Sequence, residues 1–223
     1  MLIVLLCGCF DNDTNRSEVK ILSVTQSPEN PKPDDEITIT VTAESCSGCD
    51  FNYESYFAGG SRGSRTMTKS GSGRYETKIG PFDEGTEVWY MLSASGYGGS
   101  FVVSDDYTIQ IGEVERSNIT ALSISNVHQS PQDPTTEDSI VTITSDITSD
   151  VYLTDIWFEY MHFKSHGCGG GGGGGTMSYK AGNTFEEQIY IENYDKGTKI
   201  FYRIATQDES GNTAVSPTFG FEI

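Results

Sequence analysis

Apolar and polar residues alternate in short runs from residue 19 to the end of the chain. In residues 37–42, Ile-Thr-Ile-Thr-Val-Thr, every second side chain falls on the same face, as in a β-strand buried on one side. Turn-forming residues interrupt these runs at intervals of about 8–12 residues, and no window has the 3.6-residue apolar spacing of a helix. The pattern predicts an all-β fold. The expected strands are residues 19–25, 36–43, 50–57, 65–68, 74–79, 86–94, 106–111, 119–127, 139–146, 152–163, 176–179, 184–190, 198–206 and 217–223.

The two halves of the chain repeat each other. Residues 24–28, Val-Thr-Gln-Ser-Pro, return as Val-His-Gln-Ser-Pro at 127–131. Residues 85–92, Gly-Thr-Glu-Val-Trp-Tyr-Met-Leu, match Gly-Thr-Lys-Ile-Phe-Tyr-Arg-Ile at 197–204, an offset of 112. Because chance does not keep several matches in the same order, the chain consists of two tandem modules. Each has about a hundred residues, which is enough for a sandwich of two sheets.

The second module carries the more complete motif, with Tyr-Arg-Ile-Ala at 202–205 and the turn Asp-Glu-Ser-Gly-Asn at 208–212. This order of strands and turns resembles prokaryotic Ig-like or fibronectin type III-like modules, which occur in tandem on secreted and cell-surface proteins. The resemblance covers nearly all of residues 19–223 and implies two tandem antiparallel β-sandwiches, but it implies no common activity. The expected domains are a signal remnant and tether at 1–18, a first sandwich at 19–112, a linker at 113–118 and a second sandwich at 119–223.

Two segments carry more specific expectations. In residues 86–92 the alternation puts Val88, Tyr90 and Leu92 on one face and Trp89 and Met91 on the other. Both faces are apolar at Trp89, so we expect this strand to be central in its sheet or partly covered. Residues 169–175 are all glycine, and we expect them to form a flexible, tether-like hairpin loop.

The N-terminal segment indicates where the protein is located in the cell. Residues 1–9 read Met-Leu-Ile-Val-Leu-Leu-Cys-Gly-Cys and are followed at once by polar sequence. The segment Leu-Cys-Gly-Cys at 6–9 resembles the lipobox of prokaryotic lipoproteins, although Cys7 departs from the usual pattern. The resemblance implies lipidation of Cys9 and cleavage before it. The alternative is a short apolar first strand with two buried cysteines.

Cysteine spacing adds a second expectation. Cys46 and Cys49 form a Cys-x-x-Cys motif, but the sequence has no second pair to complete a zinc site and no βαβ context for a thioredoxin-like site. We therefore predict a small structural disulfide between them in an oxidising compartment, which leaves Cys168 unpaired. Three candidate N-glycosylation sequons begin at Asn12, Asn15 and Asn118.

Charge narrows the classes of partner. Thirty-two acids and fourteen bases give a formal net charge of −18. No basic excess is available to displace phosphate counterions, so we expect no nucleic-acid partner. Acid pairs at 83–84, 105–106 and 208–209 all fall at expected turns, where solvated side chains explain them better than a hydrolase does.

We predict no metal and no other cofactor. His162, His166 and Cys168 flank the glycine run, which offers no preorganised ligand geometry. One alternative stays open, namely calcium at the junction of the modules, near Glu113 and Glu115.

The remaining candidates are aromatic. Tyr53, Tyr56 and Tyr97 lie in or beside glycine-rich segments, where exposed rings stack on sugars or anchor a partner, whereas rings on alternating strands more often belong to the core. We expect a non-enzymatic, lipid-anchored protein on the outer face of a prokaryotic membrane, structural, adhesive or protein-binding, with envelope proteins, itself or glycans as partners. One alternative is a filament or surface-layer subunit assembled by β-strand addition, with residues 1–18 as the donated strand. Another is a carbohydrate-binding accessory module.

Overall fold

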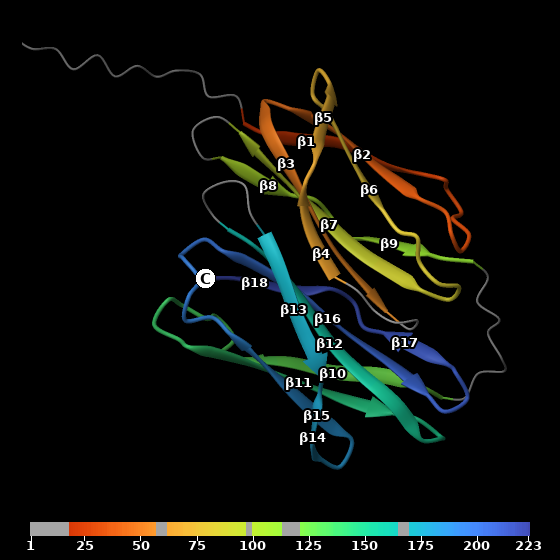
Figure 1. Ribbon diagram of the computed structural model, residues 1–223. Coiled ribbons are helices and arrows are strands. Elements are labelled where there is room, and N and C mark those ends of the chain that lie inside the picture. Colours follow the sequence, from red (N-terminus) through yellow and green to blue (C-terminus); the bar gives the residue numbers. More distant parts are fainter. Residues whose placement is uncertain (1–17, 57–61, 97–99, 113–120, 165–169) are drawn as a thin grey trace, which may run out of the picture.

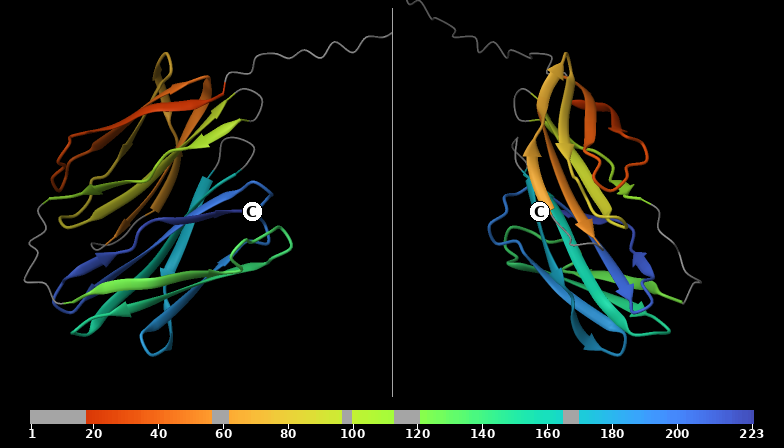
Figure 2. Two further views of the ribbon diagram at one scale, coloured as in Figure 1. Left: turned by 180° about the vertical axis from the view of Figure 1, so that it is seen from behind. Right: turned by 45° about the vertical axis from the view of Figure 1, so that its right-hand side comes forward.

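The computed structural model describes residues 18–56, 62–96, 100–112, 121–164 and 170–223. These residues form strands and turns arranged in four antiparallel sheets, two in each module (Figures 1 and 2). The described part of the chain has no helix, and so none long and apolar enough to cross a membrane. The expected all-β class is therefore confirmed.

Each module contains nine described strands. Those of the first module are β1 Lys20–Ser27, β2 Ile37–Glu44, β3 Cys46–Tyr56, β4 Arg62–Thr66, β5 Thr68–Gly71, β6 Arg74–Ile79, β7 Glu87–Gly96, β8 Phe101–Val103 and β9 Tyr107–Gln110. Those of the second are β10 Ser123–Ser130, β11 Ile140–Thr148, β12 Leu153–Phe163, β13 Gly170–Thr176, β14 Ser178–Ala181, β15 Thr184–Tyr190, β16 Lys199–Asp208, β17 Thr213–Val215 and β18 Phe219–Glu222.

The two modules have the same topology. The four-stranded sheets have the orders β1-β2-β6-β5 and β10-β11-β15-β14. The five-stranded sheets have the orders β4-β3-β7-β8, with β9 also on β7, and β13-β12-β16-β17, with β18 also on β16. This equivalence confirms two tandem Ig-like, fibronectin type III-like sandwiches. The junction that we expect at 113–118 lies outside the described residues, so its bounds stay predictions.

The strand expected at 65–68 is two strands that belong to different sheets. Met67 lies between β4 and β5, is only 4% exposed, and donates its N–H to the Cys49 carbonyl. Met177 separates β13 and β14 in the same way and donates to the Ile156 carbonyl. The edge strand thus leaves one sheet for the other at a buried methionine, which a periodicity of two cannot reveal because the alternation continues through the crossing.

Each sandwich has its own apolar core. In the first module, Val88, Tyr90 and Leu92 of β7 point into this core, as the alternation predicts. Trp89 and Met91 point away from it and belong instead to a third buried cluster, which lies between the modules. The prediction that this strand is central or partly covered is therefore confirmed, and the cover on the outer face is the second module.

The glycine run is a strand, so the expectation of a flexible hairpin loop is wrong for Gly170–Thr176. All seven residues of β13 pair with β12, from Phe163 opposite Gly170 to Trp157 opposite Thr176. Rings on β12 lie against the bare main chain: a Cβ on Gly173 would come 2.6 Å from the Tyr160 ring, and one on Gly171 would come 2.7 Å from the His162 ring. Main-chain hydrogen bonds and close ring packing therefore specify glycine here.

This arrangement predicts different results for neighbouring glycines. A Cβ on Gly174 would collide with the Phe158 carbonyl oxygen, whereas one on Gly175 would meet nothing within 4 Å. We expect Gly174→Ala to lower the free energy of unfolding by about 1–3 kcal/mol. Gly175→Ala should leave it unchanged or raise it by about 0.4–1 kcal/mol, through the unfolded state. Urea denaturation measures both, and equal small effects would show that β13 is not a packed strand.

Candidate functional site at the interface between the modules

The five-stranded sheets of the two modules pack face to face, which makes the molecule four sheets thick (Figure 2). Trp89 of β7 is fully buried at the centre of this contact. The second module contributes Met161 and Phe163 from β12 and Ala205 from β16, each no more than 1% exposed. Buried apolar area of this kind is the main favourable contribution to association between modules.

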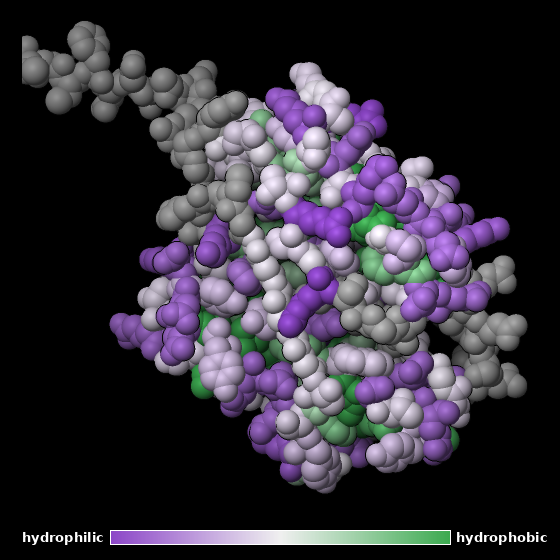
Figure 3. All heavy atoms as spheres, viewed as in Figure 1, coloured by the Kyte–Doolittle hydropathy of each residue, from purple (hydrophilic) through white to green (hydrophobic). Residues whose placement is uncertain are grey.

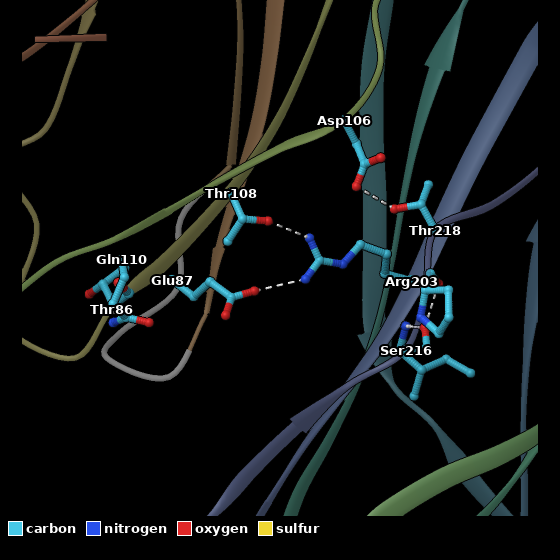
Figure 4. Close-up of polar contacts among 10 residues, drawn as sticks. Thr86, Glu87, Asp106, Thr108, Gln110, Arg203, Ser216 and Thr218 are labelled. Carbon is cyan, nitrogen blue, oxygen red and sulfur yellow. Dashed lines mark hydrogen bonds and ion pairs between the residues drawn. The ribbon is translucent and has the colours of Figure 1, made fainter. Parts of the chain in front are cut away.

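A buried arginine joins the two sheets at this interface. Arg203 of β16 is 5% exposed, and its Nη2 donates to Oε1 of Glu87 on β7 at 2.7 Å (Figure 4). Its Nη1 donates to the Thr108 hydroxyl at 3.3 Å, and its Cζ lies 5.1 Å from the centre of the Trp89 ring. The guanidinium thus makes an ion pair, a hydrogen bond and a cation–π contact, all with the first module.

The interface is nearly two-fold symmetric. Asp106 and Thr218 occupy the same position in the two repeats, 112 residues apart, and the Thr218 hydroxyl donates to Oδ2 of Asp106 at 2.7 Å. Equivalent residues touch in this way only near a symmetry axis. Glu87 pairs with Arg203. In the repeat, Lys199 is the equivalent of Glu87 and Met91 is the equivalent of Arg203, and these two residues line the same groove. Each module therefore uses the same patch to contact the other.

This groove, of about 430 Å³, opens beside the symmetry axis. Its apolar lining includes Met91 and Phe201, and acids from both modules lie at its edge. Asp106 is an exposed acid between strands, as expected, and it also accepts the inter-module hydrogen bond. Asp208 is not a solvated acid, because it is 1% exposed and accepts hydrogen bonds from the N–H groups of Ser210 and Asn212, which hold the expected hairpin turn.

A second, smaller cavity of about 190 Å³ lies between β3 and β4 of the first module and β13 of the second. Asn52, on the outward face of β3, lines it and is only 1% exposed. Among the described residues, neither Nδ2 nor Oδ1 of this amide has a hydrogen-bond partner. Sequence reasoning missed Asn52 and Arg203, because both occupy ordinary outward positions of strands whose outer face only the docked module buries.

The two cysteines of the Cys-x-x-Cys motif lie on either side of a bulge in β3. Their sulfurs are 3.3 Å apart in the thiol form, with Cys46 half-buried and Cys49 buried. A disulfide requires about 2.05 Å, so the sulfurs need only a small approach to bond. The disulfide stays a prediction.

We expect the protein isolated from its native compartment without reductant to have Cys46 and Cys49 protected from alkylation after unfolding. Treatment with dithiothreitol should expose both, and Cys46→Ser should leave Cys49 reactive. The closed loop is short, so reduction should cost about 2 kcal/mol of stability. Peptide mapping by mass spectrometry checks the pairing. Free thiols at both positions in native material would contradict it.

The expected binding rings do not form a site in the described residues. Tyr53 is 8% exposed and packs in the core against Phe51 and Phe82, so the expectation of an exposed ring is wrong for this residue. The cause is the strand alternation, which points Tyr53 inward. Tyr56 ends β3, but its side chain lies outside the described part, as does all of Tyr97.

Other expected sites also lie outside the described residues, so these expectations stay predictions. They are lipidation at Cys9, the sequons at Asn12, Asn15 and Asn118, the calcium alternative at Glu113 and Glu115, and the pair His166 and Cys168.

Within the described ranges, no group of three or more His, Cys, Asp or Glu side chains is placed to hold a metal. His162 instead packs against the Tyr194 ring, and its Nδ1 lies 3.2 Å from the Tyr194 hydroxyl. Burial, with a smaller contribution from Lys164, lowers the pKa of His162. A neutral, hydrogen-bonded imidazole covering the glycine strand is the structural role of this residue.

The buried ion pair at the interface predicts a large effect from one carboxylate. Glu87→Ala leaves the buried Arg203 without its acid, so we expect the free energy of unfolding to fall by about 3–5 kcal/mol. The matched control is Glu76→Ala, which removes an equally short but solvated pair, 2.8 Å from Arg74, and should cost about 1 kcal/mol or less. Chemical denaturation measures both. Similar losses for the two variants would show that Arg203 is not held by the interface.

No protein-family model and no curated protein matches this chain. A tetra-tandem repeat from the extending region of a large adhesion protein aligns with 92% of the chain and 48% of its own, at 15% identity and a TM-score of 0.34. A 1.5-MDa bacterial ice-binding adhesin aligns with 93% and 65%, at 14% identity and a TM-score of 0.30. A purple acid phosphatase from yellow lupin (Lupinus luteus) seeds aligns with 89% and 40%, at 9% identity and a TM-score of 0.33. The chain spans less than two thirds of each of these structures. Their low scores carry no argument about function.

Proposed function

We propose that this chain is a non-enzymatic surface protein, anchored by a lipid on Cys9 to the outer face of a prokaryotic membrane. Its two sandwiches form one rigid structural or adhesive unit that binds envelope proteins or glycans. The observation that carries the proposal is the face-to-face interface centred on Trp89 and Arg203. It joins two modules of a type that has no common activity into a single body with a fixed shape.

A rigid pair suits a presenting or adhesive role better than two independently moving modules do. Tandem domains with small, polar contacts move relative to each other, whereas a large apolar contact fixes their orientation. Here the contact includes a fully buried tryptophan and an arginine with three partners in the other module. Any surface formed by both modules is therefore preorganised, so binding it costs less conformational entropy.

Charge supports the outward placement. The net charge of −18 keeps the modules soluble and repels anionic lipid surfaces, so attraction to a membrane has to come from the anchor. The Leu-Cys-Gly-Cys segment at 6–9 is the feature of the sequence that would supply one. A multi-chain lipid at Cys9 would hold the protein firmly.

Expression of the full chain in a lipoprotein-processing bacterium tests the anchor. We expect intact mass to show loss of residues 1–8 and a lipid-sized gain on Cys9, with the protein in the membrane fraction. Cys9→Ser should abolish the lipid and release the protein from that fraction, whereas the matched control Cys7→Ser should be processed normally. A wild-type mass that retains Met1 would overturn the lipoprotein proposal and favour the filament alternative, in which residues 1–18 serve as a donated strand.

A further inference from the structure

The groove beside the symmetry axis is the counterpart of the pocket that holds Arg203. That pocket belongs to the first module, and the residues that contact the guanidinium are Glu87, Thr108 and Trp89. Their repeat equivalents, 112 positions later, all line the groove, and they are Lys199, Gly220 and Phe201. The near two-fold relation therefore gives the molecule two related pockets, one filled by an arginine and one open to solvent.

The groove is open because the residues at two of these positions are small. Met91 stands where symmetry would place a second Arg203, and it is 2% exposed, so it forms part of the floor. Gly220 stands where Thr108 lies in the other pocket, and a Cβ there would come 2.9 Å from the Phe201 ring. The remaining volume of about 430 Å³ is within the range of ligand pockets, about 300–1,000 Å³.

Acids outnumber bases among the described residues that line the groove. Asp105, Asp106 and Glu222 are exposed, and Lys199 is the base in this lining. Lys199 lies opposite Glu222 in the register of β16 and β18, and its Nζ is 5.5 Å from the centre of the Phe101 ring. Because Lys199 has these neighbours of its own, the two aspartates leave the groove attractive to a cation.

The outer edge of β18 borders the groove. Among the described residues, β18 pairs with β16 alone. The Ile223 N–H donates to the Thr198 carbonyl, and antiparallel pairs alternate between bonded and non-bonded. The main-chain groups of Gly220 and Glu222 therefore point away from β16, toward the position that an added strand would occupy. Four consecutive residues, 219–222, line the groove, as expected if it runs along this edge.

The groove differs from a broad apolar contact surface. On the face drawn in Figure 3, the described residues show only small groups of apolar atoms among hydrophilic ones. The groove instead combines the partly exposed ring of Phe201 with acids and a strand edge. This combination suits one long side chain and the extended main chain that carries it.

We propose that the groove docks an extended segment of a basic partner protein, which pairs with the edge of β18 and places one arginine side chain over Phe201. A guanidinium stacks on aromatic faces and donates hydrogen bonds to carboxylates. The molecule already holds Arg203 with a ring and a carboxylate, those of Trp89 and Glu87. The proposal rests on the proposed function of the chain as a surface protein that binds envelope proteins, and it gives the chemistry of that partner.

Charge favours a basic partner over a second copy of this chain. The net charge of −18 makes two copies repel each other, and the exposed acids of the groove add to that repulsion at the point of contact. A basic segment is attracted by the same charges, which also raise the rate of association.

The test titrates the isotope-labelled full chain with the end-capped peptide Ser-Thr-Val-Arg-Val-Thr-Ser and follows backbone amide shifts by NMR. We expect the amides of Gly220 and Glu222 to shift with a Kd on the order of 1 mM, as suits a short peptide. The same peptide with citrulline in place of arginine keeps the shape without the charge, and it should bind about fivefold more weakly or worse. Added salt should weaken the arginine peptide more than the citrulline peptide.

A double variant of the groove and a matched control separate local charge from net charge. Asp105→Asn combined with Glu222→Gln removes two exposed acids of the groove and should weaken binding of the arginine peptide about fivefold. Asp133→Asn combined with Glu137→Gln removes two exposed acids between β10 and β11 and should leave the Kd within about twofold of the wild type. Equal Tm values would show that both variants fold normally.

Three outcomes would overturn the proposal. The first is no shift of the Gly220 and Glu222 amides at millimolar arginine peptide. The second is equal binding by the citrulline peptide, or by the groove variant and the wild type, because the charge would then not be recognised. The third is binding of arginine amide as tightly as the peptide, which would make the groove a site for a small cation without a role for the strand edge. Lipidation at Cys9 is measured separately by mass, so a failure here leaves the anchor proposal intact, and a failure there leaves the groove proposal intact.

Discussion

The burial of the Arg203 guanidinium is the constraint on which the arrangement of the two modules depends. A charge taken out of water has to find its partners nearby, and all those described above belong to the first module, namely Glu87, Thr108 and the Trp89 ring. Separation of the modules would return both charges of the Glu87–Arg203 pair to water but would also expose the apolar cluster around Trp89. Apolar burial therefore supplies most of the affinity between the modules, and the polar contacts fix the orientation in which they dock.

Alternation along the chain predicts what each strand does inside its own sandwich, and little beyond it. The inward set Val88, Tyr90 and Leu92 could be read directly from the sequence, and the second apolar face at Trp89 showed that a cover exists. The identity of that cover could not be read, because docking pairs residues more than a hundred positions apart. Asn52 has the same limitation, since an outward polar residue is unremarkable until another module buries it.

The glycine run shows a different limit. A run of glycines has no pattern of apolar and polar side chains, so the sequence alone predicts only a flexible segment. In the fold, pairing with β12 and the rings of Tyr160 and His162 supply the order that the glycines lack by themselves. The result is a strand thin enough to lie against the first module, and this thinness leaves room for the cavity beside Asn52.

The near two-fold relation has a consequence for partner choice. If two first modules met through this patch, Glu87 would lie opposite Met91, a buried acid without a base. If two second modules met, Lys199 would lie opposite Arg203, and like charges would repel. A base faces an acid at the buried position only when a first module meets a second. The patch therefore favours contact between unlike modules, although its geometry is nearly two-fold symmetric. The segment between Gln110 and Ser123 keeps the correct partner at a high effective concentration, and pairing within one chain outcompetes exchange between chains.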